Sequence, residues 1–164
     1  LIGSRNYVTW EMLEEMSNLG MNIGSHTCSH KNLLLLKDKD LNKEIRISKS
    51  IIEQKIGKEV LNFSCPYGIY NKRIENYAKK YGYKNFFTSN NGLSKADSFK
   101  KNRNSINSLT TKKSFMNILY PSTTRQFRWI TEEYLKNSIK TVVGMENYLM
   151  IRKLYAKLIS NYRI

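Results

Sequence analysis

The two histidines of the chain, His26 and His30, lie four residues apart in one short segment. Two imidazoles at this spacing can bind one cation, and neutral imidazole is the commonest protein ligand of zinc. A His-Glu-x-x-His helix would need glutamate at the position of Thr27, and the Gly-Ser pair before His26 does not favour a continuous helix. The pair therefore indicates a metal site in a loop, with Thr27 and Ser29 placed to form hydrogen bonds within the loop and so hold the rings in place. A structural or chance pairing is the alternative.

Three repeats of helix, glycine and strand make up the elements that must position these histidines. Each expected helix has an apolar stripe at helical spacing, and a glycine follows it. The expected helices span 10–19, 38–56 and 72–81, with Thr9 and Asn71 as N-caps, and the expected strands span 21–25, 60–63 and 83–88. This alternation is typical of an α/β protein with a parallel sheet.

The loops that follow the first two expected strands contain the residues best suited to chemistry. In open α/β sheets, ligands and catalytic groups gather at the carboxyl ends of the strands. We therefore expect His26, His30 and the turn formed by Pro66 and Tyr67 to lie along one edge of the sheet. Pro66 has no N–H and a fixed φ, so it can hold that turn rigid, although an ordinary tight turn would have the same sequence.

The composition of the chain argues against several classes of protein. No window of about 18 apolar residues is present, so a transmembrane span is not expected, and two cysteines are too few for a disulfide scaffold. No signal peptide is recognisable at the start, so the location stays open. The net charge of +15 suits an anionic partner, or simply lysine-rich solvated faces, but no helix-turn-helix, RNP or zinc-finger spacing accompanies it.

The last part of the chain is the most basic. Residues 97–164 carry 13 basic and 4 acidic residues, giving +9. A short strand is expected near 104–106, a short helix at 113–119, and a helical stretch over 131–162 with a break at Gly144. Its apolar residues form two stripes, one of Leu135, Ile139, Val142 and Val143, the other of Tyr148, Ile151, Leu154, Tyr155, Leu158 and Ile159. These helices either pack as a hairpin on the rest of the protein or contact a membrane surface or an acidic polymer.

Three segments, at 7–13, 20–30 and 63–71, share their order and spacing with a known family. They read Tyr-x-Thr-Trp-Glu-Met-Leu, Gly-Met-Asn-Ile-Gly-Ser-His-Thr-Cys-Ser-His and Phe-Ser-Cys-Pro-Tyr-Gly-Ile-Tyr-Asn. Over roughly residues 1–106 the chain resembles the polysaccharide deacetylase family, the NodB-homology proteins of carbohydrate esterase family 4. The His-[Ser/Thr]-x-[Ser/Thr]-His element is a specific signature of that family.

The resemblance implies a fold, a metal and a reaction. The fold would be α/β, a partial distorted (β/α) barrel of the polysaccharide deacetylase type, followed by a helical C-terminal segment. The family holds a divalent metal, usually zinc, through an aspartate and two histidines, which match His26 and His30. It removes N-acetyl groups from polymers such as chitin, peptidoglycan or poly-N-acetylglucosamine, with a backbone donor to the oxyanion that matches Tyr67. A bacterial hydrolase at the cell envelope or a membrane surface is therefore expected.

The chain departs from the family pattern at several points. The Thr-Phe-Asp-Asp-Gly motif, which supplies the metal-binding aspartate and the catalytic base, is expected upstream of Leu1. Ser64 stands where arginine is frequent, Lys31 where proline is frequent, and the late histidine that acts as general acid has no counterpart. Because catalytic zinc sites use three protein ligands, Cys28 or Cys65 is a candidate for the third.

Three functions remain open at this stage. The first is a metal-dependent polysaccharide deacetylase domain over 1–106, N-terminally incomplete and weakly active or inactive, followed by a basic helical extension over 107–164. The second is a glycan-binding relative without activity, in which Tyr67, Tyr70 and Trp10 would stack on sugars. The third is a basic nucleic-acid-binding protein, although no specific nucleic acid is expected as a partner.

Overall fold

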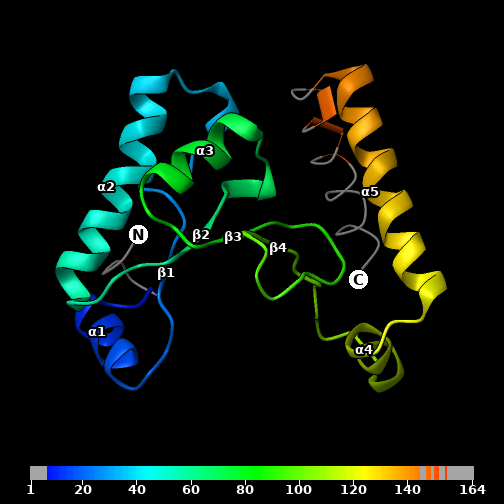
Figure 1. Cartoon of the computed structure of the whole chain (residues 1–164), viewed down its shortest axis with the longest axis horizontal. Coiled ribbons are helices and arrows are strands. Elements are labelled where there is room, and N and C mark those ends of the chain that lie inside the picture. Colours follow the sequence, from blue (N-terminus) through cyan, green and yellow to red (C-terminus); the bar gives the residue numbers. More distant parts are fainter. Residues whose placement is uncertain (1–6, 145–146, 149, 152–153, 155–164) are drawn as a thin grey trace. The chain divides into compact units, whose positions relative to one another are not determined.

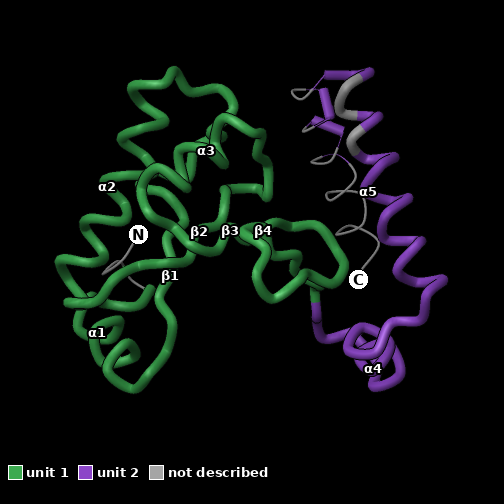
Figure 2. The backbone as a smooth tube through the Cα atoms, viewed as in Figure 1, with its two compact units in different colours: residues 1–105 green, residues 106–164 purple. Residues whose placement is uncertain are grey.

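The computed structural model describes residues 7–144, 147–148, 150–151 and 154. The chain divides into two compact units, residues 1–105 and 106–164 (Figure 2). This division lies one residue before the boundary expected from the sequence, while the roles expected for the two parts stay predictions. Among the described residues, no helix is long and apolar enough to cross a membrane.

A parallel sheet forms the centre of the first unit (Figure 1). Its four strands lie in chain order, each paired with the next: β1 (Gly24–Ser25), β2 (Asn62–Ser64), β3 (Asn85–Phe87) and β4 (Lys100–Lys101). The predicted α/β fold is confirmed, because helices alternate with the strands of a parallel sheet. In the described residues the sheet does not close on itself, as expected for a partial barrel. The prediction of a strand near 104–106 is wrong. The fourth strand is β4, which pairs with β3: the Phe86 N–H donates to the Phe99 carbonyl and the Thr88 N–H to the Lys101 carbonyl.

The three helices of the first unit form where the sequence predicts them. These are α1 (Trp10–Asn18), α2 (Asp38–Ile56) and α3 (Lys72–Lys80), with short 3₁₀ turns η1 (Leu33–Leu35) and η2 (Pro66–Gly68) in the loops. Thr9 and Asn71 cap α1 and α3 through their side-chain oxygens, as Thr and Asn do at helix N-termini. Gly57 ends α2 with φ of 66°, a conformation that glycine adopts without strain.

One apolar core joins these helices to the sheet. The helix α2 packs against α1, α3 and β1 and buries one stripe of its surface at helical spacing, as expected. A buried hydrogen bond, 2.8 Å from Ser25 Oγ to Ser48 Oγ, ties β1 to α2. The core residues are Leu13, Leu33, Leu41, Ile45, Ile56, Val60, Phe63, Cys65, Ile74, Ala78, Tyr83 and Phe86.

The second unit contains two described helices, α4 (Lys112–Leu119) and α5 (Thr123–Val143). The helix α5 begins eight residues before the predicted start at 131, because Ser122 caps it through a hydrogen bond from the Arg125 N–H. It ends at Gly144, where the break was predicted. Of the second predicted apolar stripe, Tyr155, Leu158 and Ile159 lie outside the described residues.

Candidate active site

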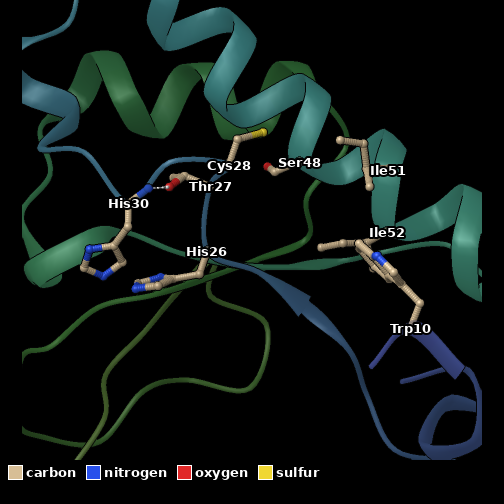
Figure 3. A pocket seen from close by; sticks show the side chains of 8 residues that line it. All are labelled: Trp10, His26, Thr27, Cys28, His30, Ser48, Ile51 and Ile52. Carbon is tan, nitrogen blue, oxygen red and sulfur yellow. Dashed lines mark hydrogen bonds between the residues drawn. The ribbon is translucent and has the colours of Figure 1, made fainter. Parts of the chain in front are cut away.

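The carboxyl edge of the sheet brings together the residues that the sequence singled out. His26 follows β1 directly, and Tyr67 lies in the turn after β2. The ring centroids of His26 and His30 are 5.0 Å apart, and those of His30 and Tyr67 are 4.8 Å apart. In Figure 3 the two imidazole rings lie side by side on the same side of the loop. The structure therefore places the histidine pair and the tyrosine turn in one cluster.

Ser64, the last residue of β2, fixes the His26 ring. The His26 Nδ1 atom lies 2.8 Å from the Ser64 carbonyl oxygen and 2.9 Å from its Oγ. Because a carbonyl oxygen can only accept, Nδ1 carries the proton and Nε2 keeps a free lone pair. Burial, followed by the charges of His30 and Arg103, lowers the pKa of His26, although the bond to Ser64 opposes this. Metal-binding histidines typically anchor their second nitrogen in this way.

Glu44, on α2, holds the loop that carries both histidines. Its Oε2 atom accepts the backbone N–H groups of Cys28 and Ser29, each at 2.9 Å, and its Oε1 accepts the Ser29 hydroxyl. Burial alone would raise the pKa of Glu44, but these hydrogen bonds lower it overall. The carboxylate is therefore ionised at neutral pH and clamps the loop to α2. Sequence reasoning missed this residue, which is one charge among many on a polar helix face.

Thr27 forms a hydrogen bond within the loop, as expected, whereas Ser29 bonds to Glu44, and neither bond is to an imidazole ring. The Thr27 hydroxyl accepts the His30 N–H at 3.2 Å, and Ser29 bonds to Glu44. Thr27 thereby gives a partner to the His30 N–H in the turn, while the Ser29 hydroxyl donates to the carboxylate of Glu44. The ring itself is held by Ser64, which the sequence marked only as a departure from the family pattern.

Backbone strain is concentrated in this cluster. Among the described residues, Thr27, His30 and Tyr67 are the non-glycine residues with positive φ, at 70°, 56° and 61°. The left-handed region costs L-residues free energy, most of all β-branched ones such as threonine. Strained residues persist only where the surrounding structure holds them, and they are frequent at functional sites. The strain supports a functional role for this edge of the sheet.

The turn after β2 has the conformation expected of a rigid element. Pro66 is buried and opens η2, and the Gly68 N–H closes the turn by donating to the Cys65 carbonyl at 3.1 Å. Tyr67 is half exposed, with its ring against His30. The roles of Pro66 in stiffening the turn and of the Tyr67 backbone as an oxyanion donor stay predictions, which this geometry allows.

The prediction that a cysteine completes the metal site is not supported. Cys65 points into the core with 1% of its surface exposed, and burial raises the pKa of its thiol to about 12. Cys28 is exposed, but its thiol lies 3.8 Å from the Glu44 carbonyl oxygen. No set of three His, Cys, Asp or Glu side chains suited to a metal occurs in the part of the chain that the structure describes.

The two cysteines should differ strongly in reactivity. We expect iodoacetamide at pH 8 to alkylate Cys28 and to leave Cys65 unmodified, because only the thiolate reacts and a pKa of about 12 lowers the thiolate population of Cys65 by ~10³ relative to an ordinary thiol. Partial burial and the charge of Glu44 also raise the pKa of Cys28, but its thiol is exposed to the reagent. Peptide mass spectrometry after timed quenching measures both rates, and alkylation in urea gives the control. Equal rates in the folded protein would contradict the buried position of Cys65.

Arg103, just beyond β4, also reaches this edge. Its Nε atom donates to the Thr88 carbonyl at 2.7 Å, and a terminal nitrogen lies 3.4 Å from Ser89 Oγ. Its charge is near enough to contribute to the lowered pKa of His26. The sequence analysis did not assign this arginine to the site. It adds a positive charge beside the histidine pair.

A pocket of about 320 Å³ opens next to the histidines (Figure 3). Polar groups form one side of it and apolar side chains from α1 and α2 the other. The lining residues are Trp10, His26, Thr27, Cys28, His30, Ser48, Ile51 and Ile52. Tyr70, expected to stack on sugars, is partly buried and has its ring 5.0 Å from that of Phe86. Its stacking on sugars stays a prediction.

Comparison with known proteins agrees with this arrangement. The family model described as polysaccharide deacetylase matches residues 1–86, which is more than half of the chain. The chain belongs to the polysaccharide deacetylase family. It is 30% identical over 96 residues to the putative polysaccharide deacetylase YxkH of Bacillus subtilis (strain 168), a match that covers 58% of this chain and 34% of that protein. The resemblance found in the sequence motifs is thus confirmed.

Solved structures of deacetylases share the fold. The Streptococcus pyogenes deacetylase PplD, in complex with acetate, superposes with a TM-score of 0.67 and 25% identity, over 73% of this chain and 54% of that one. The polysaccharide deacetylase BC0361 of Bacillus cereus gives 0.63 and 23%, over 72% and 38%. The chain therefore spans about a third of the curated relative and about half of PplD.

The clamp by Glu44 leads to a prediction about metal affinity. We expect Glu44→Ala to weaken Zn²⁺ binding by about tenfold, because residues that orient metal ligands typically contribute ~10–100-fold to affinity. Glu44→Gln should restore part of the loss, since the amide oxygen still accepts one N–H. Competition with a chromophoric chelator gives the affinities. Arg46→Ala, on an exposed part of the same helix, is the matched control, and an equal loss there would contradict a specific role for Glu44.

Proposed function

We propose that the protein is a metal-dependent hydrolase that removes N-acetyl groups from an amino-sugar polysaccharide of the chitin, peptidoglycan or poly-N-acetylglucosamine type. The observation that carries this proposal is the adjacency of two imidazoles, one anchored through Nδ1, to the Tyr67 turn at the carboxyl edge of a deacetylase fold. Such a substrate would place the protein at the cell envelope.

The donors present suit zinc, but they do not complete a site. Neutral imidazoles are good zinc ligands, and the lowered pKa of His26 keeps that ring neutral. The described residues offer two such ligands and no third, whereas catalytic zinc usually has three from the protein. His26 and His30 would therefore hold the metal together with a further ligand, which the family pattern assigns to an aspartate.

A bound metal would activate water and polarise the acetyl carbonyl. The remaining tasks fall to residues of this chain. Ser64 and Glu44 keep the imidazoles oriented, so that binding of the metal requires little reorganisation. The rigid turn at Pro66 would present the Tyr67 backbone N–H to the oxyanion that develops on the acetyl group. The Arg103 guanidinium adds a favourable field for that negative charge.

Two measurements test the proposal. The first is Zn²⁺-dependent binding of N-acetylglucosamine oligomers in preference to glucosamine oligomers of the same length. The second is release of acetate from the acetylated oligomers. We expect the 164 residues to show the first and little or none of the second, because two ligands hold zinc poorly. Zinc-dependent acetate release that is lost in His26→Ala would establish the activity and contradict only the expectation that the chain is inactive.

A second function is favoured by the same shortage of metal ligands. A relative that binds glycans without hydrolysing them would need no zinc, and it would use the Trp10 wall of the pocket and the half-exposed Tyr67 ring. Binding of acetylated oligomers that persists in chelator and in His26→Ala would support this function. A lack of preference for acetylated over free amino sugars, with and without zinc, would exclude both functions.

A further inference from the structure

The helix α5 exposes several large apolar side chains on one face. Phe127, Ile130, Tyr134, Leu135 and Val142 are between 59% and 85% exposed. At 100° per residue they fall within an arc of roughly 140° of the helix surface. Thr131 and Ser138 fall within the same arc. Single exposed apolar residues are ordinary, but a group of five large ones on one face indicates a surface that binds something apolar.

The opposite side of α5 is charged and contains a buried tryptophan. Trp129, which lies roughly opposite the apolar arc, is 8% exposed, and the Arg125 guanidinium stacks over its ring at 5.4 Å. Arg128 pairs with Glu132 at 2.9 Å on the flank of the arc. The helix therefore buries an aromatic side chain on its charged side and leaves its apolar side outward, the reverse of the pattern for a helix that packs its apolar stripe into its own core.

The charge of this unit indicates the nature of the partner. Residues 106–164 contain ten basic and three acidic residues, giving +7, and the stretch 112–143 from α4 to α5 contains six and two, giving +4. Lys112 and Lys113 begin α4 and are exposed. A protein partner with an apolar face need not be acidic, whereas a bilayer with anionic headgroups offers an apolar interior and a negative surface together.

We propose that α5 is a peripheral membrane-binding helix that lies in the surface of a bilayer containing anionic lipid. The arc of Phe127, Ile130, Tyr134, Leu135 and Val142 enters the boundary between headgroups and acyl chains. Lys112, Lys113 and Arg128, among the described basic residues, remain at the level of the headgroups, where they attract negative lipid. Phe127 and Tyr134 suit this position, because aromatic residues favour the interface. This inference is independent of the proposed enzymatic function.

Co-sedimentation of the full chain with vesicles tests the proposal. We expect the partition coefficient to be at least about tenfold higher for phosphatidylcholine mixed with phosphatidylglycerol than for phosphatidylcholine alone, and to fall as salt increases. The variant Phe127→Gln/Ile130→Gln/Tyr134→Gln should lose about tenfold or more. Leu93→Gln/Leu109→Gln, which removes two exposed leucines outside α5, should bind like the wild type.

A second measurement serves if the triple variant does not fold. In Phe127→Trp, a conservative change, anionic vesicles should shift the added tryptophan emission to the blue, and brominated lipid should quench it beyond the signal of Trp10 and Trp129 in the wild type. Equal partition into neutral and anionic vesicles, or no quenching, would overturn the proposal. A third result would also overturn it: the wild type does not bind vesicles but self-associates with increasing concentration in ultracentrifugation, and the triple variant does not self-associate. The arc would then bind a second copy of the chain.

Discussion

Replacing either His26 or His30 by alanine is expected to lower the affinity of the chain for Zn²⁺ by more than about a hundredfold. The two rings lie 5.0 Å apart, and the described residues contain no third ligand that could replace one of them. A single imidazole leaves no chelate, so the loss should exceed the ~10–100-fold that removal of an orienting partner costs. Competition with a chromophoric chelator measures the affinities, and Co²⁺ absorption reports the ligand set.

Two further variants separate ligation from general damage to the loop. Ser64→Ala removes one of the two contacts to His26 Nδ1 but leaves the backbone carbonyl in place, so its effect should be smaller, about tenfold or less. Lys39→Ala, which removes an exposed charge on α2 away from these contacts, should bind zinc like the wild type. If the histidine variants bind zinc as well as the wild-type chain does, the assignment of this pair as metal ligands is wrong, whereas a wild-type chain that binds no zinc would show that the pair cannot hold the metal without the further ligand.

The helices and the order of the sheet could be predicted because their signals are local. Thr9, Asn71 and Gly57 mark helix ends through capping, which depends on a few neighbouring residues. The fourth strand was misplaced because β4 covers only two residues, both lysine, and such a strand forms through pairing with β3 and not through its own preference.

The residues that support the site were harder to predict, since their roles depend on contacts between distant parts of the chain. Glu44 lies 15 residues from Ser29, and Ser64 lies 38 residues from His26. No local sequence pattern marks a serine at the end of a strand as the partner of a histidine ring, or a glutamate on a polar helix as the partner of a loop. The histidine pair itself was predictable because two chelating side chains stand at fixed spacing in one loop.

The second large effect is expected at Gly68, where alanine should destabilise the first unit by about 2–5 kcal/mol. Gly68 has φ of 66°, and a Cβ added there would overlap the Ser89 side chain. The left-handed conformation costs an alanine about 1–2 kcal/mol, and overpacking typically adds ~1–3 kcal/mol. A domain of ordinary stability, with about 5–15 kcal/mol to lose, would be weakened markedly. Urea unfolding followed by circular dichroism measures the change in the free energy of unfolding.

Ser89→Gly provides the matched control, because it removes the Cβ and Oγ atoms that the new methyl group would meet. The double variant Gly68→Ala/Ser89→Gly should recover the steric part of the loss and keep only the cost of the left-handed conformation, about 1–2 kcal/mol. Ser89→Gly alone gives up one long hydrogen bond from Arg103 and should cost less than Gly68→Ala. The two changes should therefore be non-additive, as expected for residues in contact. Additive effects would show that the turn tolerates a side chain at Gly68 by moving away from Ser89.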